Sequence, residues 1–356
     1  MKTGLSLEEM AAEITRQRSL KEDYLVDTRN LQMAPHSGQV YLHIFNGKEE
    51  CVEPMQVNSI AHRQLGAHLH IPAAYYDRML EEDPALLAQN VNTWLYRSPS
   101  RRIVRTMGGT ARAFLSDRYR RLDNFEIASA VLPIIGQMKD ARFESCQVTD
   151  SMMYLKVVNT RLEAEVSPGD IVQAGMIISN SEVGTGAVNV QPLVYRLVCS
   201  NGMIVNDART RRNHVGRVNK LEEAYRLYSD KTLEADDRAF LMKLQDTVKA
   251  AVEETRFARV VDLMKTAAKT EMTTDDIPGT VRMASREFHI TESEEKGILQ
   301  HLIEGKDLSL YGLSNAVTRY SQDVESYDRA TELESIGYNI LSMPAGTWRR
   351  INQPAA

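Results

Sequence analysis

Arginine is the residue type most concentrated in one part of this sequence. Between residues 97 and 121 the chain has eight arginines, no lysine and a single acid, Asp117, although the whole protein carries a net charge of −5. A guanidinium group offers a planar fork of donors that matches a phosphate and stacks on a base. The segment therefore predicts a phosphate-binding surface made of Arg97, Arg101, Arg102, Arg105, Arg112, Arg118, Arg120 and Arg121.

Aromatic side chains are interleaved with these arginines. Phe114 and Tyr119 lie inside the segment, and an aromatic ring beside a basic groove can stack on a nucleobase. Tyr119 therefore joins the candidate nucleic-acid-binding residues. The alternative is that the arginines pair with acids of the helical C-terminal half, or lie at a subunit interface.

A second basic group follows the predicted sheet, around the strand-to-turn junction at residues 198–202. If a sheet brings this group beside the first, the two would line one groove that tracks a nucleic-acid backbone. Its members are Arg196, Arg209, Arg211, Arg212, His214, Arg217 and Lys220, with Asp207 nearby.

Residues 59–81 have the length and turn placement of a DNA-reading helix–turn–helix. The second helix, 73–81, begins Ala-Ala-Tyr-Tyr and has few side chains that can read base edges, so a structural helical pair is favoured. His62, His68 and His70 have no carboxylate or cysteine at ligand spacing. We therefore expect no metal and no other cofactor.

Enzyme signatures are mostly absent from the sequence. There is no phosphate-binding GxxxxGK[ST], no HExxH and no GxSxG, and Gly184-Thr185-Gly186 leads into a predicted strand rather than a helix. The acids Glu163, Glu165 and Asp170 cluster near a turn, where exposed carboxylates are usual. We therefore expect a protein that is not an enzyme.

The alternation of apolar residues predicts an α+β fold. We expect a mostly antiparallel sheet core with a packed helix at 124–138, and a β-hairpin that turns at Gly108-Gly109. N-terminal helices and a long helical C-terminal region would flank this core. The expected domains are an N-terminal strand and helical region (1–97), the α+β core (98–217), the helical region (218–340) and an extended tail (341–356).

The composition is that of an ordinary globular protein, with 43% hydrophobic and 26% charged residues. The cysteines, Cys51, Cys146 and Cys199, are scattered and form no CxxC pair, which fits a reducing compartment. No apolar run reaches the length of a signal sequence or a membrane span. We expect a soluble, cytoplasmic protein that does not contact a membrane.

Three motifs stand in a recognisable order. Phe114-Leu-Ser-Asp-Arg-Tyr-Arg-Arg-Leu-Asp-Asn124 is followed by a helix, paired strands and Tyr195-Arg-Leu-Val-Cys-Ser-Asn-Gly202, and Tyr311-Gly-Leu-Ser-Asn-Ala-Val-Thr-Arg-Tyr320 comes last. Over about residues 100–340 this order resembles the phage/plasmid-like protein family of unknown function. The chain departs from the family pattern in its Arg-Leu-Val-Cys-Ser-Asn junction and at Arg319, where an acidic residue is common. The resemblance implies a setting on mobile elements, and so DNA metabolism or conflict with a host.

More distantly, the hairpin–helix–sheet order looks like the core of the Red-beta and ERF-type single-strand annealing proteins of phages. The leading hypothesis is a DNA-binding accessory factor that holds or anneals single strands in recombination or replication. Such a protein would gain avidity as a homo-oligomeric ring or filament, assembled by the long helices after residue 218. Two alternatives stay open: an interaction protein that binds or blocks a host protein, and a metal-dependent nuclease using Glu163, Glu165 or Asp170.

Overall fold

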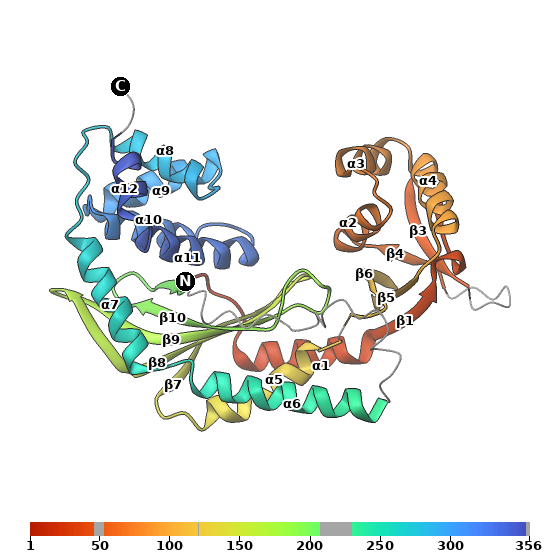
Figure 1. The fold of residues 1–356 in the computed structure, drawn as a ribbon, viewed down its shortest axis with the longest axis horizontal. Helices are drawn as coiled ribbons and strands as arrows, with labels where there is room; N and C mark the ends of the chain where they lie inside the picture. The colour runs from red at the N-terminus through yellow and green to blue at the C-terminus, as the bar shows by residue number, and fades with distance from the viewer. Residues whose placement is uncertain (46–52, 120, 207–229, 354–356) are drawn as a thin grey trace.

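The computed structural model describes residues 1–45, 53–119, 121–206 and 230–353. It confirms an α+β fold, in which two separate sheets each pack against helices (Figure 1). The sequence predicted a single sheet core, but the observed strands are divided between these two sheets. Figure 1 shows the first sheet with its helices at one end of the molecule and the C-terminal helices at the other, above the second sheet.

The first sheet is six-stranded in the order β1-β5-β6-β4-β3-β2, antiparallel except where β4 runs parallel to β6. Three helices, α2 to α4, pack over one face, and their apolar sides enclose Leu65, Met79 and Leu87. The elements are β1 (Lys21–Asp27), a short 3-10 helix (Thr28–Asn30), β2 (Leu31–His36), β3 (Gln39–Ile44), β4 (Met55–Val57), α2 (Ser59–His68), α3 (Ala73–Glu82), α4 (Pro84–Arg97), β5 (Arg101–Met107) and β6 (Thr110–Ser116).

Local chemistry explains several of these boundaries. The Asn58 side chain accepts a hydrogen bond from the Ala61 amide and begins α2, and Asp83 caps α4 in front of Pro84. The expected hairpin is confirmed: β5 and β6 pair up to Met107 and Thr110, and both Gly108 and Gly109 have positive φ. Two consecutive residues of positive φ match the right-handed twist of the paired strands.

The second sheet is five-stranded and antiparallel in the order β11-β10-β9-β8-β7. Side chains alternate between its faces. Leu155 and Val157 pack in the core between the sheet and helices α1, α5 and α6, while Tyr154 and Val158 face α11. The elements are α1 (Leu7–Leu20), α5 (Asn124–Gly136), β7 (Ala141–Val148), β8 (Met153–Ser167), β9 (Asp170–Asn180), β10 (Asn189–Arg196), β11 (Asn201–Ile204) and α6 (Asp230–Lys249).

The remaining helices form a C-terminal group, in which α10 and α11 pack against β11 and α7 packs against β8. They are α7 (Glu254–Ala268), α8 (Ile277–Glu287), α9 (Glu292–Gly305), α10 (Leu310–Tyr320), α11 (Tyr327–Leu341) and α12 (Ala345–Ile351). The extended tail expected from residue 341 is corrected, because α12 is helical and buries Trp348 and Ile351 in the C-terminal core. Within the described part of the chain, no helix combines the length and apolar character needed to cross a bilayer.

The structure also divides the chain differently from the expected boundary at residues 97 and 98. Strand β5 pairs with β1 along its whole length, so the hairpin belongs to the first sheet. Helix α1, in contrast, packs beneath the second sheet (Figure 1). The pairing partner of a strand is not encoded in its own residues, which is why the sequence placed both segments wrongly.

Candidate nucleic-acid interface

Arg105 is buried, at 1% exposure, and its guanidinium group is fully engaged inside the protein. Its Nε lies 2.8 Å from Asp23, its Nη2 lies 2.6 Å from Asp123, and its Nη1 donates to the Glu182 carbonyl oxygen at 2.9 Å. Burial by itself lowers the pKa of Arg105, but the two carboxylates outweigh it and raise the pKa. The predicted phosphate contact is therefore corrected for Arg105, because a phosphate cannot reach a group that two acids already enclose.

Arg112 is the second buried arginine. It occupies the position where the β5–β6 register shifts, and its Nη1 lies 2.7 Å from Glu182 Oε2. Glu182 also accepts hydrogen bonds from Lys21 and from the Asn124 amide. Burial raises the pKa of Glu182, but Lys21 and Arg112 outweigh it, so the pKa is lowered. Arg112 therefore also leaves the predicted surface.

These six charged residues form what we call the junction cluster: Lys21, Asp23, Arg105, Arg112, Asp123 and Glu182. It joins β1, β5 and β6 of the first sheet to the loop after β9 and the start of α5. The arginines do pair with acids, as the structural alternative predicted, but those acids do not come from the helical C-terminal half. The junction cluster links the two sheets.

Arg196 is the member of the second basic group that the structure describes, and it is engaged within the second sheet. Arg196 pairs with Asp170 at 2.6 Å and lies over the ring of Tyr311, at the end of β10 in the second sheet. Asp170 is thereby engaged as well, which removes one acid from the alternative nuclease site. Arg209, Arg211, Arg212 and Arg120 lie outside the described residues.

Tyr119 is not free to stack on a base. Its ring is half-buried against the cluster of Ile103, Leu115 and Val183, and its hydroxyl donates to the Ser181 carbonyl oxygen at 2.9 Å. Burial raises the pKa of the phenol. The predicted stacking role is therefore corrected, because the apolar faces of the ring are already used in packing.

The other arginines of the segment that the structure describes do reach the surface. Arg97, Arg101, Arg118 and Arg121 are exposed, and Arg102 is half-buried. Arg102 pairs in register with Ser116, so the start of β5 and the end of β6 lie side by side at the open end of the hairpin. The end of α4, which carries Arg97, leads directly to this end of the hairpin. Arg121 also approaches Asp23 at 3.6 Å.

Beside the open end of the hairpin is a hollow of about 810 Å³, which we call the aromatic hollow. Tyr75 of α3 and Trp94 of α4 line it, and their side chains are 46% and 42% exposed. The turn between α2 and α3 forms another wall, with His68 and His70, and Arg102 closes the side toward β5. The Arg97 guanidinium lies 5.9 Å from the Trp94 ring.

Hydrogen bonds hold Arg102 in a defined position. Its Nη2 lies 2.8 Å from His68 Nδ1, and His68 Nε2 lies 3.3 Å from the Ser100 hydroxyl. Burial, helped by the positive charges of Arg102 and His70, lowers the pKa of His68 to about 4. The imidazole is therefore neutral at pH 7, and because Arg102 can only donate, Nδ1 accepts and Nε2 carries the proton.

The helical pair α2–α3 is held together as a structural unit. His62 Nδ1 lies 2.8 Å from the buried Tyr76 hydroxyl, and His70 takes the left-handed conformation that ends α2. Burial lowers the pKa of His62 to about 4, so it is a neutral core histidine. Within the described ranges, no group of three or more potential ligand residues could hold a metal ion.

Tyr75 and Trp94 are the functional candidates that sequence reasoning missed. Trp94 precedes Arg97 by three residues, a spacing that places both on one side of a helix, and this was the available signal. Tyr75 gave no such signal, because only the packing of Tyr76 against His62 decides that its neighbour faces outward.

Comparison with known proteins assigns the chain to a family. Residues 113–339 match the family model described as a domain of unknown function (DUF932), which is more than half of the chain. The chain belongs to the DUF932 family. No curated protein and no solved structure matches it. The DUF932 match begins in β6 and ends in α11, so it contains the second sheet, whereas every residue that lines the aromatic hollow precedes it.

Proposed function

We propose that this DUF932 protein binds single-stranded DNA at the aromatic hollow and along the adjoining open end of the β5–β6 hairpin. The observation that carries the proposal is the pair of half-exposed rings, Tyr75 and Trp94, beside the guanidinium groups of Arg97 and Arg102. Stacking of a base on an aromatic side chain contributes about 1–3 kcal/mol and tolerates any sequence, because every base has a π-face. The rings would take bases, and Arg97, Arg101, Arg102, Arg118 and Arg121 would take phosphates.

The distribution of charge supports a local rather than a general interaction. The protein as a whole is acidic, at −5, so binding has to come from a local basic surface. His68 holds Arg102 before any ligand arrives, which lowers the entropy lost on binding. Each phosphate contact on a single strand adds roughly 0.7 to the salt-dependence slope. Four or five exposed arginines therefore predict a slope of about 3.

The biological setting proposed with this activity is a phage or plasmid factor that protects or anneals single strands. Annealing is driven by base pairing itself, so the protein need only hold the strand with its bases available and needs no nucleotide hydrolysis. A homo-oligomeric ring or filament would multiply the few contacts of each subunit.

The test is fluorescence anisotropy with a labelled thirty-nucleotide single strand and the matching duplex over a salt series. The double variant Tyr75→Ala/Trp94→Ala is expected to bind the single strand tenfold to a hundredfold more weakly, as the loss of one to two stacked bases implies. Tyr96→Ala is the matched control, because Tyr96 is 71% exposed on α4 but does not line the aromatic hollow. Absence of binding at low salt would overturn the proposal.

A second candidate is a protein interface at the same place. Exposed tryptophan, tyrosine and arginine side chains together are also the composition of interaction hot spots. An acidic partner surface would then meet the arginines. Retrieval of a protein partner that Trp94→Ala abolishes, with no strand binding in the anisotropy assay, would favour this candidate.

A further inference from the structure

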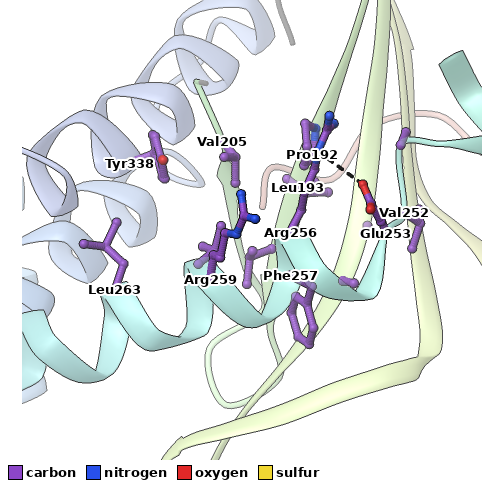
Figure 2. Close-up of a pocket in the computed structure, with 15 residues that line it drawn as sticks. Pro192, Leu193, Val205, Val252, Glu253, Arg256, Phe257, Arg259, Leu263 and Tyr338 are labelled. Carbon is purple, nitrogen blue, oxygen red and sulfur yellow. Dashed lines mark ion pairs between the residues drawn. The ribbon is translucent and has the colours of Figure 1, made fainter. Parts of the chain in front are cut away.

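A second cavity, unrelated to the aromatic hollow, lies between the second sheet and α7. It has a volume of about 280 Å³ and is partly open to solvent, and Figure 2 shows the residues that line it. We call it the α7 pocket. Its floor comes from Pro192, Leu193 and Val194 of β10, and its wall comes from Phe257, Val260 and Leu263 of α7. The volume is at the small end of the range for ligand pockets, which is about 300–1,000 Å³.

The lining of the α7 pocket suits an apolar occupant. Close-packed interiors rarely keep a space larger than a water molecule, so a hollow of this size inside the C-terminal core leaves apolar atoms without neighbours. Three small residues, Ala174, Gly175 and Ala251, contribute to that space. An apolar ligand that enters a preformed, poorly hydrated pocket restores those contacts.

The mouth of the α7 pocket carries charge of one predominant sign. Arg256 and Arg259 extend from α7 beside it, and Glu253 is paired with Arg256 at 3.5 Å (Figure 2). Both members of that pair are about half exposed, so the ion pair is weak and readily exchanged. Arg259 is exposed and, among the described residues, forms no ion pair. One guanidinium is therefore available, and a second can be recruited.

We propose that the α7 pocket binds a small amphipathic carboxylate. The apolar body would fill the space between β10 and α7, and the carboxylate would lie at the mouth between Arg256 and Arg259. A guanidinium group suits this role because its paired donors match the two oxygens of a carboxylate. A neutral ligand would leave the arginines unused, and a cation would be repelled. The α7 pocket lies wholly within the DUF932 match, and the proposal does not depend on DNA binding.

Isothermal titration calorimetry of the full chain with decanoate, below its micellar concentration, tests the proposal. We expect saturable binding at one site with a negative heat-capacity change, which marks burial of apolar surface. Decanol and decyltrimethylammonium are the neutral and cationic probes. Decanol is expected to bind roughly tenfold more weakly, because it lacks the charge-assisted hydrogen bonds. Equal affinity for decanol and decanoate, or no saturable binding of decanoate, would overturn the proposal.

Three variants locate the site. Arg256→Ala/Arg259→Ala is expected to weaken decanoate binding roughly tenfold and to leave decanol binding unchanged. Lys265→Ala is the matched control, since Lys265 is exposed on the same helix outside the pocket. Val252→Phe places a larger side chain in the wall and should abolish binding of both probes, with a thermal melt to check the fold. If it does not fold, the arginine variant still decides, because its side chains are on the surface. Unchanged decanoate affinity in the arginine variant would also overturn the proposal.

Discussion

The junction cluster and the aromatic hollow use the same residue type from the same short segment in opposite ways. Arg105 is enclosed by Asp23, Asp123 and the Glu182 carbonyl group, and it links the two sheets. Arg101, four residues earlier on the same strand, is exposed at the open end of the β5–β6 hairpin. A buried cation needs acidic partners for its stability, whereas an exposed one contributes little to folding and is free for a ligand. Arginines that are close together in sequence therefore need not lie on one surface.

The largest expected effect is at the junction cluster, on stability. Glu182→Ala removes the partner of the buried Lys21 and Arg112 side chains and leaves them uncompensated. We expect the free energy of unfolding to fall by about 3–5 kcal/mol. Urea denaturation followed by circular dichroism measures this. Glu253→Ala, which breaks an exposed pair, serves as control with an expected change below about 0.5 kcal/mol. A similarly small change in the free energy of unfolding in both variants would contradict the contrast between buried and exposed arginines.

The next effect concerns pH and the helical pair beside the aromatic hollow. The pKa of His62 is lowered from 6.5 to about 4, so its proton binds more tightly in the unfolded state. The corresponding stability is complete above pH 6.5 and is lost as the pH falls toward 4. Between pH 8 and pH 5 this histidine should account for about 2 kcal/mol of lost stability.

Urea denaturation at several pH values tests this expectation. The variant His62→Gln, which cannot titrate, should lose less stability than the wild type over the same interval. His68 shifts in the same direction but is half-exposed, so the remaining dependence should be small. Parallel pH profiles for the wild type and the variant would show that His62 is not held neutral.

A smaller effect is expected at the hydrogen bond that positions Arg102. His68→Ala removes the Nδ1 acceptor at 2.8 Å and frees the guanidinium to move. We expect affinity for a single strand to fall about threefold to fivefold, because an ordered side chain costs roughly 0.5–1.5 kcal/mol to immobilise. Anisotropy at one salt concentration measures the change. His36→Ala, on β2, is the control and should bind as the wild type does. No change in His68→Ala would mean that Arg102 takes no part in binding.

The smallest effect, and the sharpest comparison, concerns the salt dependence. Arg97→Ala should lower the slope of log affinity against log salt by roughly 0.7, with little effect on stability. The control Arg161→Ala removes an exposed arginine from β8 in the second sheet and should leave the slope unchanged. A slope that falls equally in both variants would show that the whole protein surface attracts the DNA strand, rather than the open end of the hairpin beside the aromatic hollow.

Much of the local structure was predictable from the residues themselves. The hairpin at Gly108-Gly109, the helix from Asn124 and the alternating strands of the second sheet follow from turn chemistry, capping and periodicity, which act between near neighbours. The basic character of the segment around Arg101 was also evident. The helix α12 was missed because its formation depends on a surface, distant in sequence, that buries Trp348.

The sequence by itself determined the fold class, the main elements and the place along the chain where arginines gather. Only the tertiary structure decided which of them are buried. The partners of Arg105 stand 82, 18 and 77 residues away along the chain, in Asp23, Asp123 and Glu182. Likewise Tyr75, Trp94 and Arg102 meet only because α3, α4 and β5 pack around one hollow. Burial and charge pairing are properties of neighbours in space, and periodicity along the chain reports only neighbours in sequence.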